Sequence, residues 1–266
     1  MGMVAVTMAA GLLLAACGSG ALTVAKVKSN GKLVWCSDIT YPPEEFYQGS
    51  TPAGSDIEIG QAIAKSIGVT AEFDNTGFDG IIPALLAKKC DVIISGMNDN
   101  PERRKQVDFV DYLSVGQSFM VQKGNPAGIQ GIPDLAGKTV SVEVGTTNAA
   151  YLKTQSDKLA AGGSQGFTIQ PFPKDTDAAN ALKTGKVDAY FGDAPVVAYY
   201  IAQDPTAFDF GGAAVNPISV GIAVRKADTD LKAAVQSAVT TMYSSGQMCT
   251  ILAKWKMTPT ALGGKC

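Results

Sequence analysis

The chain has 266 residues, of which 46% are hydrophobic and 17% are charged, and its formal net charge is −2. This length suffices for one large domain or two of ordinary size, and the charge argues against a broad cationic surface for nucleic acid. The chain contains no histidine, which excludes histidine metal sites, Ser-His and Cys-His nucleophile pairs and histidine acid–base catalysis. No Cys-x-x-Cys spacing suggests zinc, so neither a metal nor a cofactor is expected.

The first residues have the character of a targeting segment. Residues 1–16 are apolar but too short to span a bilayer comfortably, and small residues precede Cys17. This pattern resembles the bacterial lipobox, which implies cleavage before Cys17 and lipid on its thiol. We therefore expect a signal peptide over residues 1–16 and a flexible, lipidated tether over residues 17–29. The alternative is a soluble protein with an apolar tail.

The other four cysteines fall into two pairs, for which we have different expectations. Cys249 and Cys266 flank the last helix and the tail, and an exported protein can form disulfides, so this pair is predicted to be bridged. Cys36 comes late in its expected strand and Cys90 just before its own. In parallel neighbouring strands they would lie several residues out of level, which favours two buried free thiols.

The first half of the chain predicts a parallel sheet. Strands are expected over residues 32–37, 69–74 and 91–95, with helices over 55–67 and 79–89 between them. Ser55 and Glu58 form a capping-box pattern at the start of the first of these helices. The β-α-β-α-β order requires right-handed crossovers, and ligands bind beyond the carboxyl ends of such strands.

Polar and aromatic residues gather at that expected edge. Asn100 can cap a helix that has Pro101 at its first position and Arg103 in its first turn. A strand end, a small polar loop and a helix start with a fixed cation suit a small anionic group. The residues on or near the edge are Asp38, Tyr41, Phe78, Ser95, Gly96, Asn98 and Arg103.

A second α/β set follows a loop rich in glycine and proline over residues 124–133. Its strand over 187–192 ends at Asp193 and weakly echoes the strand over 91–95, which suggests two lobes facing one cleft. Further strands are expected over 115–123, 138–144, 169–172 and 221–226, and helices from 147, over 175–183 and 231–243, and around Trp255.

The two lobes supply opposite charges in small number. Arg103 with Thr147 and nearby N–H groups suits a carboxylate, and Asp193 suits an ammonium, so together they define an α-amino acid. Tyr41 and Phe78 could enclose its side chain. Singly, each has an ordinary structural explanation: Arg103 as part of a solvated basic run, Asp193 as a helix N-cap, and the aromatics as core.

At this point the sequence resembles a known family, the type II periplasmic solute-binding proteins of polar amino-acid ABC importers (family 3), which are related to ionotropic glutamate-receptor ligand cores. The resemblance covers nearly the whole mature chain. It is carried by Asp38-x-x-Tyr41-Pro42-Pro43, Gly54-Ser55-Asp56-Ile57-Glu58-Ile59, Phe78-Asp79-Gly80-Ile81-Ile82-Pro83-Ala84-Leu85, Asp91-Val92-Ile93-Ile94-Ser95-Gly96-Met97, Pro101-Glu102-Arg103, Val107-Asp108-Phe109, Gly145-Thr146-Thr147 and Gly192-Asp193.

The resemblance implies a two-lobe α/β fold in which each lobe is a mostly parallel sheet flanked by helices. Lobe 1 would comprise residues 30–118 and 220–266, lobe 2 residues 119–219, and two crossing strands would form the hinge. It also implies an extracytoplasmic, monomeric binding protein, not an enzyme, that closes around an amino acid and delivers it to the membrane subunits of an ABC permease.

The resemblance assigns roles to individual residues. Arg103 and Thr147 would bind the α-carboxylate, Asp193 the ammonium, Gly96 and Asn98 would add hydrogen bonds, and Tyr41 and Phe78 would stack on the side chain. The full candidate ligand-binding set is Asp38, Tyr41, Phe78, Ser95, Gly96, Asn98, Arg103, Glu143, Thr146, Thr147, Tyr190 and Asp193.

Three departures from the family pattern leave the side-chain pocket open. Asn98 stands where Ser or Thr is usual, Glu44 replaces a common aromatic, and Ser55 interrupts a Gly-aromatic-Asp motif. Specificity then depends on Asp38, Glu143, Glu44 and Tyr190. Asp38 and Glu143 together favour arginine or lysine, with glutamine or another polar amino acid as the rival.

Glu143 has two other interpretations. It could be a solvated edge residue, or the general acid of a dehydratase-like enzyme acting on a small carboxylic acid on the same fold.

Overall fold

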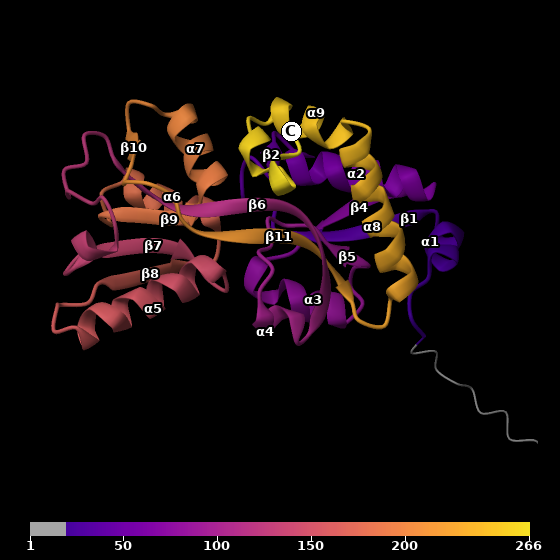
Figure 1. Cartoon of the computed structure of the whole chain (residues 1–266), viewed down its shortest axis with the longest axis horizontal. Coiled ribbons are helices and arrows are strands. Elements are labelled where there is room, and N and C mark those ends of the chain that lie inside the picture. Colours follow the sequence, from indigo (N-terminus) through magenta and orange to yellow (C-terminus); the bar gives the residue numbers. More distant parts are fainter. Residues whose placement is uncertain (1–19) are drawn as a thin grey trace, which may run out of the picture.

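The computed structural model describes residues 20–266. The predicted signal peptide over residues 1–16 and the lipidation site Cys17 lie outside this part of the chain. Among the described residues, no helix combines the length and apolar character needed to cross a membrane. Figure 1 shows two lobes side by side, connected by two long strands.

The strands form one continuous sheet in the order β4-β1-β5-β11-β6-β9-β7-β8, with β10 paired to β6. Pairing is parallel within β4-β1-β5 and within β9-β7-β8, as predicted, and antiparallel where β11 and β6 intervene. The strands are β1 (Lys32–Ser37), β4 (Thr70–Asn75), β5 (Val92–Ile93), β6 (Val107–Gln122), β7 (Thr139–Glu143), β8 (Thr168–Phe172), β9 (Ala189–Asp193), β10 (Phe208–Phe210) and β11 (Val215–Arg225), and a separate hairpin pairs β2 (Phe46–Gln48) with β3 (Thr51–Ala53).

Helices cover both ends of this sheet (Figure 1). They are α1 (Val24–Asn30), α2 (Ser55–Ile67), α3 (Ile81–Leu86), α4 (Pro101–Arg104), α5 (Thr147–Ala161), α6 (Asp175–Lys183), α7 (Ala194–Gln203), α8 (Thr229–Ser244) and α9 (Gln247–Lys254). Short 3-10 turns lie at Phe78–Gly80, Ile132–Leu135, Thr258–Thr260 and Leu262–Gly264.

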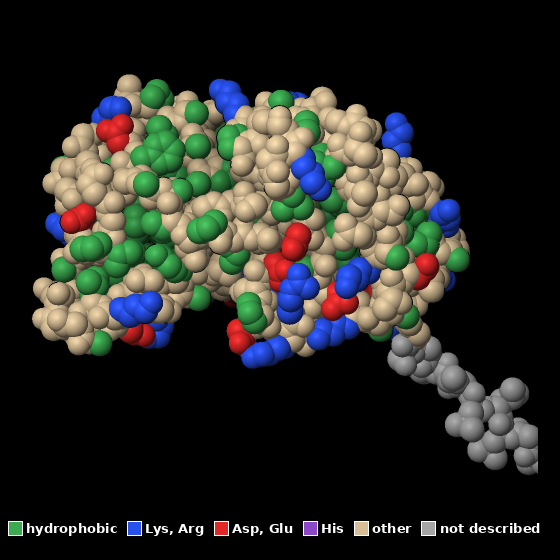
Figure 2. Space-filling view, in the orientation of Figure 1, with side chains coloured by type: hydrophobic (Ala, Val, Ile, Leu, Met, Phe, Trp, Pro, Cys, Tyr) green, Lys and Arg blue, Asp and Glu red, His purple; other side chains and the backbone are tan. Residues whose placement is uncertain are grey.

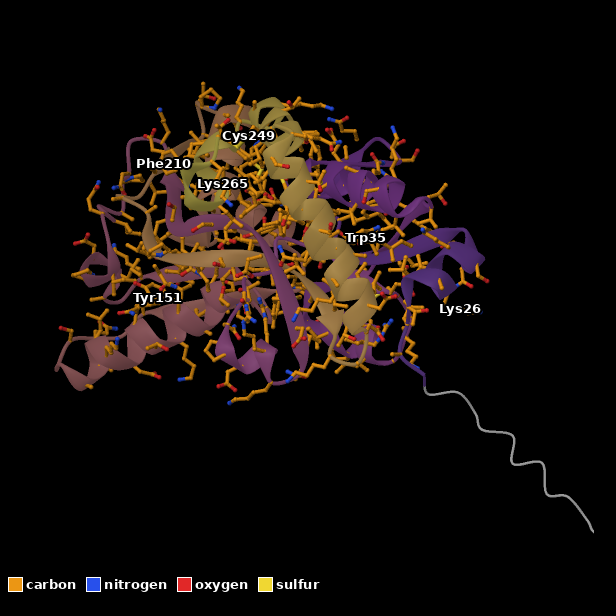
Figure 3. The ribbon with its side chains drawn as sticks, turned by 45° about the vertical axis from the view of Figure 1, so that its right-hand side comes forward. Lys26, Trp35, Tyr151, Phe210, Cys249 and Lys265 are labelled. Atoms are coloured by element: carbon orange, nitrogen blue, oxygen red, sulfur yellow. A yellow bond between two sulfur atoms is a disulfide. The ribbon has the colours of Figure 1, made fainter. Side chains whose placement is uncertain are left out.

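Two hydrophobic clusters fill each lobe. We call the first lobe the part built around β4-β1-β5. On one face of its sheet, Trp35 packs in a cluster with residues of α8 (Figure 3). On the opposite face, the adjacent Cys36 packs in a second cluster with residues of α3. The second lobe is the part built around β9-β7-β8, where Val140 and Val142 enter one cluster and Tyr190 enters the other. The predicted lobe boundaries near residues 118 and 220 stay a prediction.

The connecting strands are longer than the sequence predicted. The expected strands over residues 115–123 and 221–226 are ends of β6 and β11, which span 16 and 11 residues. Each strand passes from one lobe to the other, so its buried face changes along its length and no single alternation covers it. Register shifts between Val215 and Ile218 and between Val220 and Gly221 accompany this change.

Two local predictions are wrong, one for the segment before β1 and one for the start of α2. Residues 24–30 form helix α1, with Thr23 as its N-cap and Val27 fully buried, so the segment is not a flexible tether there. The capping box at α2 is also absent: Gly54 occupies the N-cap, and the Ser55 and Asp56 N–H groups donate to the main-chain oxygens of Pro43 and Glu44. The N-cap therefore lies one residue earlier than predicted: the Glu58 N–H donates to the oxygen of Gly54, and the Ser55 hydroxyl donates to the Met257 sulfur (3.3 Å).

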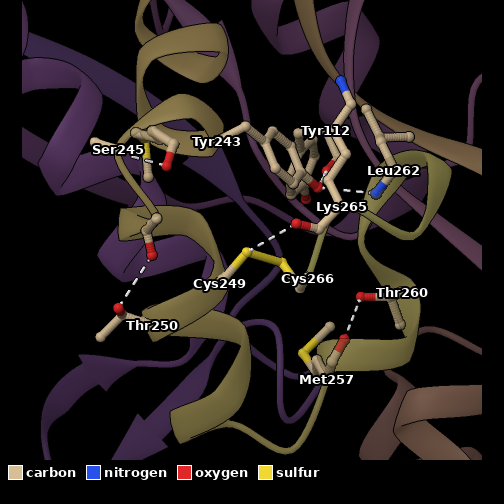
Figure 4. Close-up of a disulfide and its surroundings, with 12 residues drawn as sticks. Tyr112, Tyr243, Ser245, Cys249, Thr250, Met257, Thr260, Leu262, Lys265 and Cys266 are labelled. Carbon is tan, nitrogen blue, oxygen red and sulfur yellow. Dashed lines mark hydrogen bonds between the residues drawn. A yellow bond between two sulfur atoms is a disulfide. The ribbon is translucent and has the colours of Figure 1, made fainter.

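The disulfides give one confirmation and one correction. Cys249 and Cys266 are bridged as predicted, and the tail they hold is fixed further because the Leu262 N–H donates to the Tyr243 hydroxyl (2.9 Å; Figure 4). Cys36 and Cys90 are also bridged, with 5.6 Å between their Cα atoms, so the expectation of free thiols is wrong.

The error came from treating the chain before β5 as extended. Cys36 is level with Ile93 across the parallel pair, which would place an extended Cys90 three residues away along the strand. Instead the chain turns at Lys88, which has a φ of 61°, and the Asp91 main-chain N–H donates to the oxygen of Val34. This turn brings Cys90 back over the sheet to Cys36.

We predict that the Cys36→Ser, Cys90→Ser double variant lowers the free energy of unfolding by about 4 kcal/mol, because the bridge closes a long loop in the unfolded chain. The shorter loop between Cys249 and Cys266 should be worth about 3 kcal/mol. Denaturant unfolding of both double variants measures the losses. Alkylation of two thiols in the unreduced wild-type protein would contradict the Cys36–Cys90 bridge.

Candidate binding site between the lobes

The predicted site residues converge where strand ends of the two lobes face one another. Ser95, Gly96 and Asn98 follow β5, and Asp38 follows β1. From the second lobe, Glu143 ends β7 and Asp193 ends β9. Figure 1 shows these ends pointing toward the region that β6 and β11 cross. The parallel arrangement within each lobe therefore brings both sets of side chains to one place.

The amide of Asn98 connects the lobes directly. Its Nδ2 donates to Asp193 Oδ2 at 3.0 Å, and its Oδ1 accepts a short hydrogen bond from the Thr147 hydroxyl. Asn148 Nδ2 donates to the other oxygen of Asp193 at 3.3 Å. Asn98, which stands where the family pattern has Ser or Thr, is thus long enough to donate to a carboxylate through its NH₂ group and to accept from a hydroxyl through its carbonyl oxygen.

Arg103 is held in place by main-chain and aromatic contacts. Asn100 caps α4 by accepting from the Arg103 N–H (2.8 Å), as predicted, and Pro101 follows it. The guanidinium donates to the main-chain oxygens of Asn98 (2.6 Å) and Gly145 (3.1 Å), and its carbon lies 5.1 Å from the centre of the Phe78 ring. Burial lowers the pKa of Arg103 to about 10, so it remains charged at neutral pH.

Both lobes line a groove of about 420 Å³ beside this arginine. Arg103 and Phe78 contribute from the first lobe, and Gly145, Thr146 and Thr147 from the second. Thr146 is the N-cap of α5, accepting from the Ala149 N–H at 3.1 Å and donating to the oxygen of Glu143 at 2.8 Å. Its hydroxyl is therefore used within the loop, whereas that of Thr147 points to the first lobe.

Asp193 is the acidic counterpart of Arg103. It stands at the N-cap position of α7 but makes no capping bond, because both its oxygens accept from the amides of Asn98 and Asn148. It is 1% exposed. Burial raises its pKa to about 6, an effect opposed by the amide hydrogen bonds and by Arg103, so the carboxylate is mainly ionised at pH 7.

Further carboxyl groups lie buried on the other side of the site. Asp38 accepts from the Phe78 N–H (2.8 Å) and from the Thr40 hydroxyl (2.7 Å). Glu143 is 4% exposed, which rules out the solvated-edge interpretation, and its Oε1 has no hydrogen-bond partner among residues 20–266. Burial raises the pKa of both carboxyl groups, and the neighbouring Asp175 and Asp38 raise that of Glu143 further.

Asp175 belongs to this group, although the sequence did not single it out. It begins α6 and is 1% exposed. Its two oxygens accept hydrogen bonds from the hydroxyls of Tyr190 on β9 and Tyr200 on α7. From the sequence it was an ordinary acidic residue in the first turn of a helix; the pairing depends on two tyrosines that only the fold brings near.

Some predicted residues are engaged within the protein. Ser95 donates to Glu45 (2.9 Å) and accepts from the Asp38 N–H (2.9 Å), and the Gly96 N–H donates to Asp56 (2.9 Å). These bonds fix the loop that follows β5.

Tyr41 and Tyr190 are likewise committed. Tyr41 lies in a second-lobe cluster with Tyr190 and accepts from the Asp193 N–H at 3.2 Å. A Cβ on Gly96 would come within 2.8 Å of the Tyr41 ring, so only glycine fits there. Tyr190 is fully buried, and its hydroxyl serves Asp175. Both tyrosines therefore shape the wall of the site.

Negative charge is in excess at this place. Glu44, which stands where an aromatic residue is common in the family, is 2% exposed. Its Oε2 has no hydrogen-bond partner in the described part of the chain. Burial raises its pKa, and Asp56, Asp193 and Asp175 add to the effect. Arg103 is the buried cation against these groups, so the region favours a ligand that brings additional positive charge.

No group of three or more Asp, Glu, Cys or His within residues 20–266 is arranged to hold a metal ion. The face seen in Figure 2 intersperses basic and acidic side chains and shows no broad area of one sign. Between the lobes, one guanidinium is opposed by several buried carboxyl groups.

Known proteins resemble this chain over most of its length. The model of the bacterial extracellular solute-binding proteins, family 3, matches residues 33–258. The L-cystine-binding protein TcyJ of Escherichia coli strain K12 is 31% identical over 96% of this chain and 93% of its own. The arginine-binding extracellular protein ArtP of Bacillus subtilis strain 168 is 31% identical over 92% of this chain and 96% of its own.

Solved structures agree with this likeness. An ancestral arginine-binding protein bound to arginine superposes with a TM-score of 0.78 and 36% identity, covering 85% of this chain and 98% of its own, and an ancestral arginine-binding protein has also been solved bound to glutamine. The family match spans the two strand-end regions described above and both connecting strands. The chain is thus a bacterial extracellular solute-binding protein of family 3.

Proposed function

We propose that this protein binds a basic α-amino acid, arginine or lysine, between its lobes and delivers it to an ABC importer. The observation that carries the proposal is the opposition of Arg103 and Asp193 beside a surplus of buried carboxyl groups. Arg103 would bind the α-carboxylate and Asp193 the α-ammonium, each through charge-assisted hydrogen bonds. Thr147 and Asn98 would complete the hydrogen bonding of these two groups.

The side-chain subsite is the part of the proposal that distinguishes ligands. Asp38 and Glu143 approach from opposite lobes, and each is a buried carboxyl group to which a guanidinium or ammonium could bind. The ArtP relative is named for arginine, which supports a cationic ligand. The TcyJ relative is named for L-cystine, and a neutral ligand such as glutamine is therefore the rival to be tested.

Binding would be coupled to movement of the lobes about β6 and β11. The contacts from Asn98 to Asp193 and from Arg103 to Gly145 join residues of different lobes, so opening the cleft must break them. Bound ligand would add contacts to both lobes and favour the closed arrangement, which the permease would recognise. We further propose that the protein acts as a monomer, extracytoplasmically, anchored by lipid on Cys17, as the sequence before that cysteine suggests.

A dehydratase-like activity is the alternative. Burial raises the pKa of Glu143, which favours the protonated carboxyl group that a general acid requires. Following candidate ligands by NMR in the presence of the protein separates the two functions. Recovery of unchanged ligand supports a binding protein, and turnover of a small carboxylic acid would favour the enzyme.

We predict that Arg103→Ala weakens arginine binding by about 100-fold or more, because a buried charge-assisted contact of roughly 3 kcal/mol is lost. Asp193→Ala should have a comparable effect. Isothermal titration calorimetry measures both. Arg104→Ala is the matched control, since Arg104 is the next residue but is exposed and paired with Asp99. Equal affinities of the Arg103 and Arg104 variants would refute the assigned carboxylate role.

We also predict that Glu143→Gln shifts the preference from arginine toward neutral amino acids. The amide keeps the shape of the side chain but removes the negative charge that would face a guanidinium. Affinities for arginine, lysine, glutamine and citrulline should be compared with those of Glu102→Gln, an exposed control on α4. An unchanged ratio of arginine to glutamine affinity would place the side-chain subsite elsewhere.

A further inference from the structure

Asp175 and Glu143 form a buried pair of carboxyl groups contributed by successive elements of the second lobe. Glu143 ends β7, and Asp175 starts α6 immediately after β8, the parallel neighbour of β7. Glu143 is level with Phe172 across this parallel pair, three residues before Asp175, and Asp175 acts on the pKa of the Glu143 carboxyl group. They are 4% and 1% exposed, so bulk water contributes little to stabilising their charges.

Their hydrogen-bond partners differ. Asp175 is fully engaged by the hydroxyls of Tyr190 and Tyr200, which favour its ionised form. Glu143 has an oxygen, Oε1, with no partner in the part of the chain that the structure describes. An unpartnered buried oxygen beside an ionised carboxylate is where a proton or a cation is held most strongly.

The surroundings increase the negative potential at this pair. Asp38 and Asp79 of the first lobe add to the negative potential at Glu143, while Asp193 and Asp38 do so at Asp175. Tyr41 and Tyr200 are uncharged at neutral pH because burial raises the pKa of both. Among residues 20–266, no Lys or Arg forms an ion pair with either carboxyl group; Lys174, an exposed side chain, acts on Asp38, and Arg103 acts on Asp193.

We propose that the pair of Glu143 and Asp175 retains one proton until a basic amino acid binds, and that the ligand's side-chain cation displaces this proton into the solvent. The inference rests on the proposed function and adds Asp175 as a positioning residue of the side-chain subsite. One carboxyl O–H bond breaks, its electron pair stays on the carboxylate, and water or buffer takes up the proton. One positive charge leaves the pair as a proton and one enters with the ligand, so the charge of the occupied cluster is conserved.

This exchange makes discrimination between ligands depend on pH. Burial raises the pKa of Asp175 to about 7 and that of Glu143 well above its usual range. Because a cationic side chain binds the deprotonated pair, its affinity should fall as pH drops below about 7, by up to tenfold per pH unit for one proton. A neutral side chain leaves the proton in place and should lack this part of the dependence.

The test compares L-arginine with L-citrulline, which has nearly the same shape and no side-chain charge. Calorimetric titration in phosphate and in Tris buffer at pH 7.5 gives the number of protons released by each ligand. Both ligands bring the same ammonium and carboxylate to Asp193 and Arg103, so proton exchange there is common to the two. The difference between arginine and citrulline then reports the side-chain subsite alone. At pH 7.5 a group with a pKa of about 7 carries a proton in about a quarter of the molecules, so we expect arginine to release about a quarter of a proton more than citrulline.

Variants locate the source of the proton. Asp175→Asn and, independently, Glu143→Gln should remove most of the difference in proton release. Tyr200→Phe keeps the carboxyl pair but removes one donor that favours the ionised form, and should alter the pH at which arginine affinity falls. Asp177→Asn is the matched control, being an exposed acidic residue two positions along the same helix.

The outcomes separate the inference from the function beneath it. Arginine binding with the extra proton release, lost in the pair variants and kept in the control, supports the inference. Tight arginine binding with the same proton release as citrulline, or release that persists in both pair variants, overturns the inference and leaves the proposed function standing. Failure of arginine and lysine to bind, with a neutral amino acid binding instead, overturns both.

Discussion

The antiparallel pairing of β6 with β11 is the constraint on which the rest of the molecule depends. These two strands lie next to one another in the middle of the sheet, and each also pairs with a strand of one lobe: β11 with β5, and β6 with β9. Each lobe is thereby attached at the strand beside its ligand-facing edge. A bend in the pair changes the distance between the strand ends of the two lobes without disturbing either parallel core.

The buried carboxyl groups differ in how many hydrogen-bond donors stabilise their ionised forms. Asp193 has two amide donors and a nearby guanidinium, and Asp175 has two tyrosine hydroxyls. Glu143 and Glu44 each have an oxygen without a partner in the described chain, so desolvation raises the pKa of both. Such groups oppose folding while ionised at neutral pH, and a protein retains them at a cost in stability that a bound cation can offset.

The sequence predicted what depends on local pattern. The strand over residues 32–37 and the helix over 175–183 have the predicted bounds, and the Asn100 cap at Arg103 is present, because short-range periodicity and capping chemistry determine them. The sequence-based predictions were wrong where contacts with distant segments determine the local structure. The carbonyl groups of Pro43 and Glu44 fix the N-cap of α2 at the residue before Ser55, whose hydroxyl bonds Met257 instead, and a turn at Lys88 brings Cys90 to Cys36. Neither event leaves a signal in the neighbouring residues.

The same reasoning explains what was found and missed at the site. Residues at strand ends could be predicted, because the carboxyl ends of parallel strands meet at one edge. Asp175 could not, since its importance comes from Tyr190 and Tyr200, which lie 15 and 25 residues later. The inward direction of Glu143 followed from its alternation with Val142, but its lack of a partner is a property of the assembled lobes.

A series of hydrogen bonds connects β6 to the loop that follows β5 and contains Gly96. The Tyr112 hydroxyl on β6 donates to Asp56 at 2.6 Å, and Asp56 accepts from the Gly96 N–H. Burial raises the pKa of Glu45 well above its usual range, and its carboxyl group accepts from the Ser95 hydroxyl of the same loop. The loop is therefore tied to β6 and to α2 at once. Because these bonds all lie within the first lobe, they can persist during the proposed closure, whereas Arg103 and Asn98 gain their contacts with Gly145 and Thr147 only when the lobes meet.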